Sequence, residues 1–204
     1  MPKVTVMNNN KFLGNLTLAD KLTVLRILLI PVFVAVMFYF DKDRMYLRWL
    51  ALGVFGLAVL SDFFDGLAAR VRREKSDIGM VIDPLADKLL LLTAFIVLYG
   101  LRRHLPLNYS MPVWLVLIIV SRDLIILLGI VLLNFMKIEI PIAPSLWGKF
   151  TTFFQMAVVL CLLMDGRIFP VLSIAAATLT LISGFGYFAR GVKAINAGSI
   201  HTRD

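Results

Sequence analysis

Four aspartates stand close together in an otherwise apolar chain: Asp62, Asp65, Asp83 and Asp87. The first two are three residues apart and the last two are four apart, so each pair shares one face of a helix. The short segment between the pairs makes the two helices antiparallel neighbours, and the pairs can converge on one cavity. Converging carboxylates repel one another unless they are neutralised, and Mg²⁺ or Mn²⁺ prefers such oxygen ligands. We therefore expect a divalent-metal site here.

Residues beside the aspartates point to a phosphate ligand. Gly66 directly follows Asp65 and leaves room for a ligand to approach the helix backbone. Arg70, one turn later, can place a guanidinium on a phosphate. Carboxylates that hold divalent metals next to an arginine are the parts needed to bind a pyrophosphate and to displace a group at phosphorus. The alternative is that the acids are solvated or paired with nearby basic residues, namely Arg70, Arg72, Arg73 and Lys75.

The rest of the chain predicts an all-α integral membrane protein. Of its 204 residues 60% are hydrophobic and only 17% are charged, and the mean hydropathy is +0.88. Several apolar runs approach the roughly 20 residues that a helix needs to cross a bilayer core. Six transmembrane helices are predicted, at residues 18–40, 46–71, 80–101, 111–135, 147–165 and 168–192.

The distribution of charge predicts how the chain lies in the membrane. Lys and Arg are roughly twice as frequent in the segments on the side of both termini, which places the termini and the acidic motif on the cytoplasmic face of a multi-pass cell (inner) membrane. The net charge of +8 fits attraction to anionic lipids, and no nucleic-acid partner is expected. We expect three parts: a juxtamembrane segment at 1–17, a six-helix catalytic domain at 18–196 and a C-terminal tail at 197–204. The first segment is expected to lie on the membrane as an amphipathic helix.

The acidic motif resembles the signature of the CDP-alcohol phosphotransferase (phosphatidyltransferase) family, D-x2-D-G-x2-A-R-x8-G-x3-D-x3-D. Every fixed position and spacing is met, which makes the match specific. The likeness extends over nearly the whole chain, because the family also has six spanning helices with the motif on the second and third. The matching residues are Asp62, Asp65, Gly66, Ala69, Arg70, Gly79, Asp83 and Asp87.

The resemblance implies a reaction and a role for each motif residue. A CDP donor, expected to be CDP-diacylglycerol, binds with its pyrophosphate across two divalent cations, Mg²⁺ or Mn²⁺. Asp62, Asp65 and Asp83 are the principal metal ligands, and Asp87 contributes as a ligand and acts as the general base. The deprotonated acceptor hydroxyl attacks the β-phosphorus, and CMP leaves. The family also implies a homodimer, and a CDP site lined by Gly66, Ala69, Arg70 and Gly79.

Three further cations bear on the acceptor: Arg122, Lys149 and Arg190. If all three face the cavity, they form a second phosphate-binding patch, which suits an alcohol that carries a phosphate. Lys149 and Arg190 can instead be interfacial anchors. Arg122 lies in the middle of a span, where a charge needs an internal partner, and Asp123 alone can be that partner.

Within the family, the chain is similar to phosphatidylglycerophosphate synthases and to CMP-forming cardiolipin synthases. The stretches DPLADK and GK-x-TT-x2-Q resemble both groups, whereas SRD in the fourth span and PSLWGK lean toward the cardiolipin type. The first span has Asp20, Thr23 and Arg26 where this group often has Asn, Thr and Arg. We expect glycerol 3-phosphate as the acceptor, with phosphatidylglycerol (a cardiolipin synthase) or another phosphorylated alcohol as the alternative.

Two other classes of protein remain as alternatives to an enzyme. One is a transporter or channel lined by aspartates. Inverted repeats or helices broken in mid-membrane would be evidence for this class, and neither is visible in the sequence. A catalytically silent lipid-binding protein with the same fold is the second alternative, and the intact carboxylates speak against it.

Overall fold

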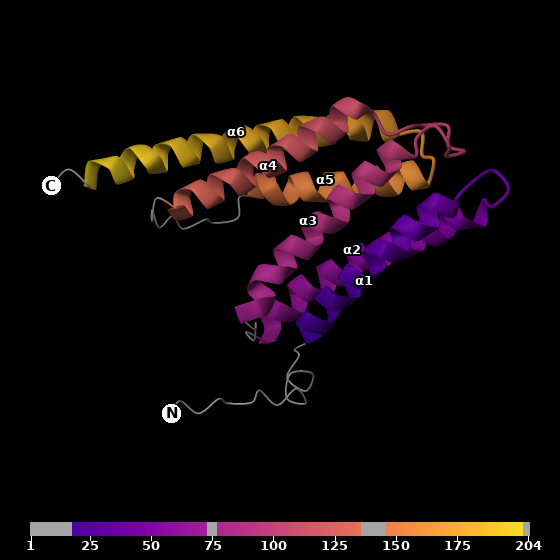
Figure 1. Ribbon diagram of the computed structural model, residues 1–204, viewed down its shortest axis with the longest axis horizontal. Helices are drawn as coiled ribbons and strands as arrows, with labels where there is room; N and C mark the ends of the chain where they lie inside the picture. The colour runs from indigo at the N-terminus through magenta and orange to yellow at the C-terminus, as the bar shows by residue number, and fades with distance from the viewer. Residues whose placement is uncertain (1–17, 73–76, 136–145, 202–204) are drawn as a thin grey trace, which may run out of the picture.

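The protein is built from helices alone over the residues that the structure describes. The computed structural model describes the backbone of residues 18–72, 77–135 and 146–201, and side chains at 23–61, 88–126, 128 and 147–189. Within these ranges the chain forms six α-helices and no strand (Figure 1). The helices are α1 (Leu18–Tyr39), α2 (Tyr46–Arg72), α3 (Asp77–Gly100), α4 (Val113–Phe135), α5 (Leu146–Leu163) and α6 (Phe169–His201).

The helix boundaries follow the apolar runs of the sequence, with one clear difference. Five helices begin and end close to the predicted spans, but α6 continues to His201, past the predicted end at 192. The prediction stopped where the apolar run stops, whereas a helix needs only residues that tolerate helical geometry. Residues 193–201 contain no proline, the residue that most strongly ends a helix, and the single glycine, Gly198, is tolerated. The segment expected as a tail, 197–204, therefore begins inside α6.

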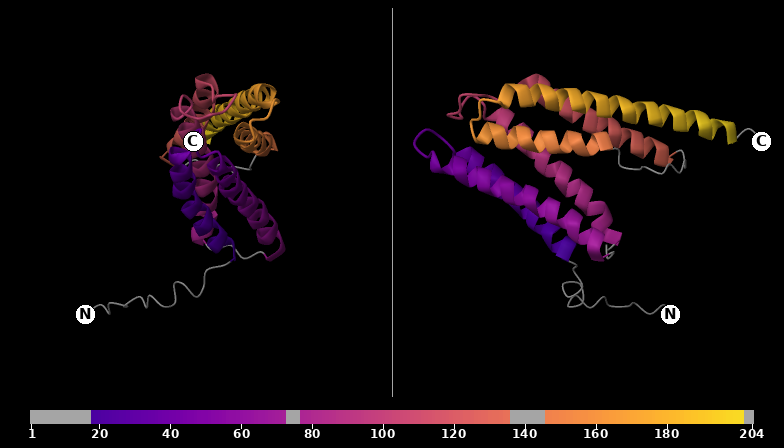
Figure 2. Two further views of the ribbon diagram at one scale, coloured as in Figure 1. Left: turned by 90° about the vertical axis from the view of Figure 1, so that its right-hand side faces the viewer. Right: turned by 180° about the vertical axis from the view of Figure 1, so that it is seen from behind.

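The helices form two groups that meet at one end of the molecule (Figures 1 and 2). In the first group α1 packs against α2 and α3, and in the second α6 packs against α4 and α5. Helix α3 runs obliquely from the first group toward the second (Figure 1), and it contacts α4 and α5. The α1–α2, α3–α4 and α5–α6 connections gather at one end, here called the loop end. The groups diverge toward the other end, where α2 ends and α3 begins, here called the motif end.

Polar contacts close the loop end. The backbone N–H of Asn108 donates to Oδ1 of Asp165 at 2.9 Å, and the Asn108 side-chain amide donates to Oδ2 of the same carboxylate. Asp165 has a φ of 56°, in the left-handed region that aspartate enters more readily than most residues. The rings of Tyr109 and Phe169 pack with their centroids 5.8 Å apart. The α5–α6 turn is thereby tied to the α3–α4 connection.

The interior changes from apolar to polar along the helices. The largest buried apolar side chains lie toward the loop end; among them are Phe33, Phe55, Phe95, Leu115 and Leu162. Apart from Ser173, the buried polar side chains of the described residues lie from the middle of the helices toward the motif end; these are Thr23, Arg26, Ser61, Arg122, Thr151, Gln155, Thr180 and Ser183. The half of the interior that leads to the acidic motif is thus the polar half.

The outer surface of the helices is rich in exposed apolar side chains. Along α6 they recur every three to four residues or at multiples of that spacing, as Val171, Ile174, Leu181, Phe185 and Phe188. Within the described residues, one segment is long and apolar enough to cross a membrane, Phe169–Ala189, with a mean hydropathy of 1.7; four other apolar segments are shorter. Apolar side chains outside and polar ones inside are the arrangement that a lipid environment favours.

Candidate active site

The acidic motif lies on two consecutive helices at the motif end. Asp62 and Asp65 belong to the last part of α2, and Asp83 and Asp87 to the first part of α3. Residues 73–76, which connect the two helices, lie outside the described residues. Both helices pack against α1, so the two acidic segments belong to the same helix group. Their side chains, like those of Gly66, Ala69, Arg70 and Gly79, lie outside the described side chains, and the roles predicted for them stay predictions.

The described side chains contain no alternative metal site. Among them, no group of three or more His, Cys, Asp or Glu residues comes together as a possible ligand set. The four aspartates of the motif are not part of that set of side chains. Any metal site built from at least three such residues therefore has to draw on the motif or on other side chains outside the described set.

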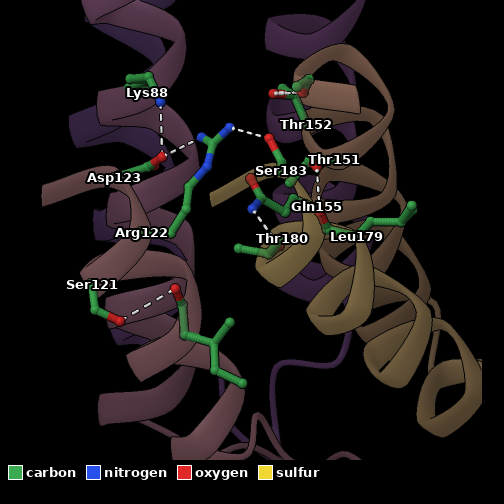
Figure 3. A network of polar contacts seen from close by, with 12 residues as sticks. Lys88, Ser121, Arg122, Asp123, Thr151, Thr152, Gln155, Leu179, Thr180 and Ser183 are labelled. Carbon is green, nitrogen blue, oxygen red and sulfur yellow. Dashed lines mark hydrogen bonds and ion pairs between the residues drawn. The ribbon is translucent and has the colours of Figure 1, made fainter. Parts of the chain in front are cut away.

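Arg122 is a buried cation in the middle of the molecule, and it has an internal partner. Its side chain is 9% exposed, and its Nη1 donates to Oδ1 of Asp123 at 2.6 Å (Figure 3). The internal partner expected from the sequence is therefore present. The Nε of Arg122 is buried and donates no hydrogen bond to any residue that the structure describes. Among the described residues, the guanidinium thus keeps one unused donor.

Lys88 brings a second cation to the same carboxylate. Its Nζ lies 2.9 Å from Oδ1 of Asp123, the atom that also accepts from Arg122 (Figure 3). The Lys88 side chain is 46% exposed and that of Asp123 is 23% exposed, so the cluster runs from the buried interior to an accessible surface. Two cations and one carboxylate leave a net positive charge. Because Lys88 directly follows Asp87 in α3, this charge stands beside the acidic motif in the chain.

Helix α6 contacts the Arg122 side chain from the other side. Nη2 of Arg122 donates to Oγ of Ser183 at 2.9 Å (Figure 3). The guanidinium carbon lies 5.6 Å from the centre of the Tyr187 ring. The side chain passes close to Gly184, where an added Cβ would lie 3.2 Å from Cγ of Arg122. A carboxylate, a hydroxyl, an aromatic ring and a glycine thus hold one guanidinium in place between α4 and α6.

A second set of polar contacts joins α5 to α6. Oγ1 of Thr151 donates to the carbonyl of Leu179 at 3.1 Å, and Nε2 of Gln155 donates to Oγ1 of Thr180 at 3.2 Å (Figure 3). Thr151, Gln155 and Thr180 are all buried. Because these bonds cross the interface between the helices, they fix the register of α5 against α6.

The described contacts do not bring the three predicted acceptor residues together. Lys149 lies in the first turn of α5 and is exposed, toward the motif end of the molecule. Arg190 follows Ser183 by two helical turns in α6, and its side chain lies outside the described side chains. Of the three, Arg122 is the one whose described contacts define a position, between α4 and α6.

The first helix contributes a further buried cation. Arg26 of α1 has no exposed surface, and Thr23, one turn before it, is 2% exposed. A buried guanidinium is retained only where partners compensate for the loss of water. These two residues match the sequence positions noted for the first span, whereas the side chain of Asp20 lies outside the described side chains.

Sequence reasoning assigned no role to Lys88 or Ser183. Lys88 carried a usable signal, because a charge inside a predicted span needs a partner. Ser183 carried none, because serine in an apolar helix usually donates to a carbonyl of its own helix. Only the packing of α4 against α6 shows that Ser183 accepts a bond from Arg122.

Comparisons with known proteins agree on one family. The sequence model of the CDP-alcohol phosphatidyltransferase family matches residues 16–184. A probable phosphatidylglycerophosphate synthase of Mycobacterium tuberculosis (strain ATCC 25618 / H37Rv) is 33% identical over 184 residues, which cover 87% of this chain and 83% of the relative.

Two further relatives carry the name CDP-diacylglycerol–glycerol-3-phosphate 3-phosphatidyltransferase. The one from Bacillus subtilis (strain 168) is 30% identical over 201 residues, covering 89% of this chain and 98% of the relative. The one from Aquifex aeolicus (strain VF5) is 32% identical over 170 residues, covering 77% of this chain and 88% of the relative. The similarity therefore spans nearly the full length of these enzymes.

Proposed function

Because the chain belongs to the CDP-alcohol phosphatidyltransferase family, we propose that it transfers a phosphatidyl group from CDP-diacylglycerol to glycerol 3-phosphate and releases CMP. The observation that carries the proposal is the near full-length similarity to relatives named for this reaction. The intact acidic motif supports it, because every residue that the family signature requires is present.

In this proposal the acidic motif binds two divalent cations, Mg²⁺ or Mn²⁺. Asp62 and Asp65 on α2 and Asp83 on α3 are the principal ligands, with Asp87 in reach. The donor set fits such ions, since it offers only carboxylate oxygens and no His or Cys occurs between residues 61 and 88. When bound, the cations supply positive charge that offsets the charge developing on the phosphate oxygens.

The donor and the reacting hydroxyl are handled by residues of the same two helices. Gly66, Ala69, Arg70 and Gly79 line the CDP site, and Arg70 binds a phosphate oxygen. Asp87 accepts the proton of the acceptor hydroxyl. The acceptor oxygen then forms a bond to the β-phosphorus, while the bond from that phosphorus to the bridging oxygen breaks and the electron pair leaves with CMP.

The acceptor phosphate is bound by Arg122, together with Lys149 and Arg190. The surroundings of Arg122 support this assignment, because no described residue accepts a hydrogen bond from its buried Nε, and the neighbouring Lys88 adds positive charge. The exposed Lys149 supports it through its position in the first turn of α5, at the motif end. A phosphate on the acceptor gains charge-assisted hydrogen bonds that a neutral alcohol does not.

We further propose that all six helices span the cell (inner) membrane, with both termini and the motif end on the cytoplasmic side. Helix lengths support this topology: the shortest helix, α5, has 18 residues, and the other five have 22 or more. At about 1.5 Å per residue, each approaches or exceeds the roughly 30 Å of a bilayer core. The exposed apolar side chains of the helices then contact lipid. Residues 18–196 form the catalytic domain, and the protein assembles as a homodimer.

A CMP-release assay tests the proposed function. Purified protein in detergent receives CDP-diacylglycerol, Mg²⁺ or Mn²⁺, and one acceptor at a time: glycerol 3-phosphate, phosphatidylglycerol, inositol phosphate or serine. We expect CMP with glycerol 3-phosphate. CMP with phosphatidylglycerol alone would move the assignment to a cardiolipin synthase, and no CMP with any acceptor would refute the enzyme.

A further inference from the structure

One carboxylate oxygen in the structure holds two cations that come from different helices. Oδ1 of Asp123 lies 2.6 Å from Nη1 of Arg122 and 2.9 Å from Nζ of Lys88 (Figure 3). Arg122 and Asp123 belong to α4, whereas Lys88 belongs to α3. Asp123 is therefore the point at which the charged side chains of the two helices meet.

The cluster joins two parts of the proposed active site. Lys88 directly follows Asp87, the proposed base, on α3. Arg122, the proposed acceptor ligand, is held on its other side by Ser183 of α6. A continuous chain of polar contacts thus runs from the residue next to the base, through Asp123, to the guanidinium that receives the acceptor phosphate.

We propose that Lys88 and Asp123 are positioning residues that set the acceptor phosphate at a fixed distance from the general base. The inference rests on the proposed function, since it concerns the geometry of that reaction. Asp123 orients the Arg122 guanidinium, and Lys88 fixes α3, and with it the Asp87 backbone, against α4. Neither residue has to touch a substrate for this role.

A positioning role of the Lys88–Asp123 ion pair can be distinguished by experiment from a role in folding stability. Lys88 is half exposed, and ion pairs of this kind contribute little to folding stability. Losing the contact of Lys88 with Asp123 therefore leaves the fold intact, and Asp123→Asn keeps a side-chain oxygen that can accept the hydrogen bond of the buried Arg122 guanidinium. A displacement of reacting groups on the order of 1 Å, by contrast, can lower the rate by roughly 100-fold. The two roles consequently predict different results for the same variants.

A double-mutant cycle on the full-length enzyme tests the inference. The variants are Lys88→Met, Asp123→Asn and the double variant, assayed by CMP release with CDP-diacylglycerol, Mg²⁺ and varied glycerol 3-phosphate. Each single variant should lower kcat/KM for glycerol 3-phosphate by ~10- to ~100-fold, while the KM for the donor changes by less than about twofold. Because Lys88 acts through Asp123, the double variant should be no worse than Asp123→Asn.

Matched controls complete the design. Lys42→Met and Asp43→Asn remove the same charges from the exposed α1–α2 connection and should leave the kinetics unchanged. Lys88→Arg keeps the charge and should recover most of the activity. The thermal midpoints of Lys88→Met, Lys88→Arg and the two control variants should agree with that of the wild type within a few degrees. Asp123→Asn removes a charge from beside the buried Arg122, so its midpoint is measured and its kinetics are recorded well below that temperature.

Three results would overturn the positioning role: additive losses in the double variant, equal effects on donor and acceptor KM, or activity losses that follow thermal stability. If the wild-type enzyme is active and the Lys88 and Asp123 variants have unchanged kinetics, the inference is refuted while the proposed function stands. A wild-type protein that releases no CMP with any acceptor would refute the proposed function, and the inference with it.

Discussion

Arg122 and Ser183 meet across two helices, with Nη2 of the guanidinium 2.9 Å from the serine Oγ. The bond fixes the end of a long side chain that Asp123 holds from the other side. A guanidinium held at both Nη1 and Nη2 presents one orientation to a ligand. The bond to Ser183 therefore contributes to the packing of α4 against α6 and to the binding of a ligand by Arg122.

Replacing Ser183 with alanine should weaken acceptor binding. The variant removes an interhelical hydrogen bond worth ~0.5–2 kcal/mol and frees the guanidinium to rotate. We expect the KM for glycerol 3-phosphate to rise roughly 3- to 10-fold with a smaller change in donor KM, because each 1.4 kcal/mol is about tenfold. Ser173→Ala is the matched control: this buried serine donates to the carbonyl of Phe169 in its own helix. Equal KM values for both variants would contradict the account.

Replacing Gly184 with alanine should act through the same guanidinium. The new Cβ would lie 3.2 Å from Cγ of Arg122, so the side chain has to shift by a few tenths of an ångström. Alanine in a helix interior otherwise gains about 1 kcal/mol over glycine. At Gly186 an added Cβ meets no atom of the described residues within 4 Å, so Gly186→Ala should raise the thermal midpoint without changing the kinetics. Gly184→Ala should gain less stability and raise the acceptor KM several-fold; identical behaviour of the two variants would argue against a constrained Arg122.

Asp165 should matter for stability and not for turnover. Its carboxylate accepts two hydrogen bonds from Asn108, and its φ of 56° disfavours most other residues. Asp165→Ala loses both bonds and keeps the strained backbone, so we expect a loss of about 1–3 kcal/mol in thermal unfolding experiments. Asp165→Asn should lose less, because asparagine tolerates this φ. The kcat should remain near that of the wild type, because the contact lies at the loop end, opposite the acidic motif. A loss of kcat without a loss of stability would show a role in catalysis.

Asp87→Asn should abolish turnover while donor binding persists. Asparagine cannot accept the proton of the acceptor hydroxyl, and loss of a general base costs ~10²- to ~10⁴-fold in kcat. CMP release measures the rate, and equilibrium binding of CDP-diacylglycerol measures the donor site. Asp43→Asn, in the exposed α1–α2 connection, serves as the control. A near-normal rate for Asp87→Asn would mean that another group is the base.

The helices were predictable from the sequence because their apolar runs are nearly as long as a bilayer core is thick. The predicted spans match α1 to α5 closely, and the end of α6 was missed because helical geometry continues after the apolar run ends. The placement of the acidic motif on two consecutive helices was predictable too, because residue spacing alone puts each pair on one helix face, whereas its metal-binding role stays a prediction.

The polar network was less predictable because it depends on how helices pack. Ser173 and Ser183 lie in the same helix, yet the first donates to its own helix and the second accepts from Arg122. Nothing in the local sequence distinguishes them. In the same way, a lysine and an aspartate 35 residues apart form a pair only because α3 crosses α4 at that point.

The identity of the lipid product tests the central claim most directly. Wild-type protein is given CDP-diacylglycerol and Mg²⁺ with equal amounts of glycerol 3-phosphate and phosphatidylglycerol, and the extracted lipids are identified by mass spectrometry while CMP is quantified. The account predicts phosphatidylglycerophosphate in a one-to-one ratio with CMP, and no product after chelation of the metal. Cardiolipin as the main product would contradict the acceptor, and the absence of both CMP and new lipid would contradict the enzyme itself.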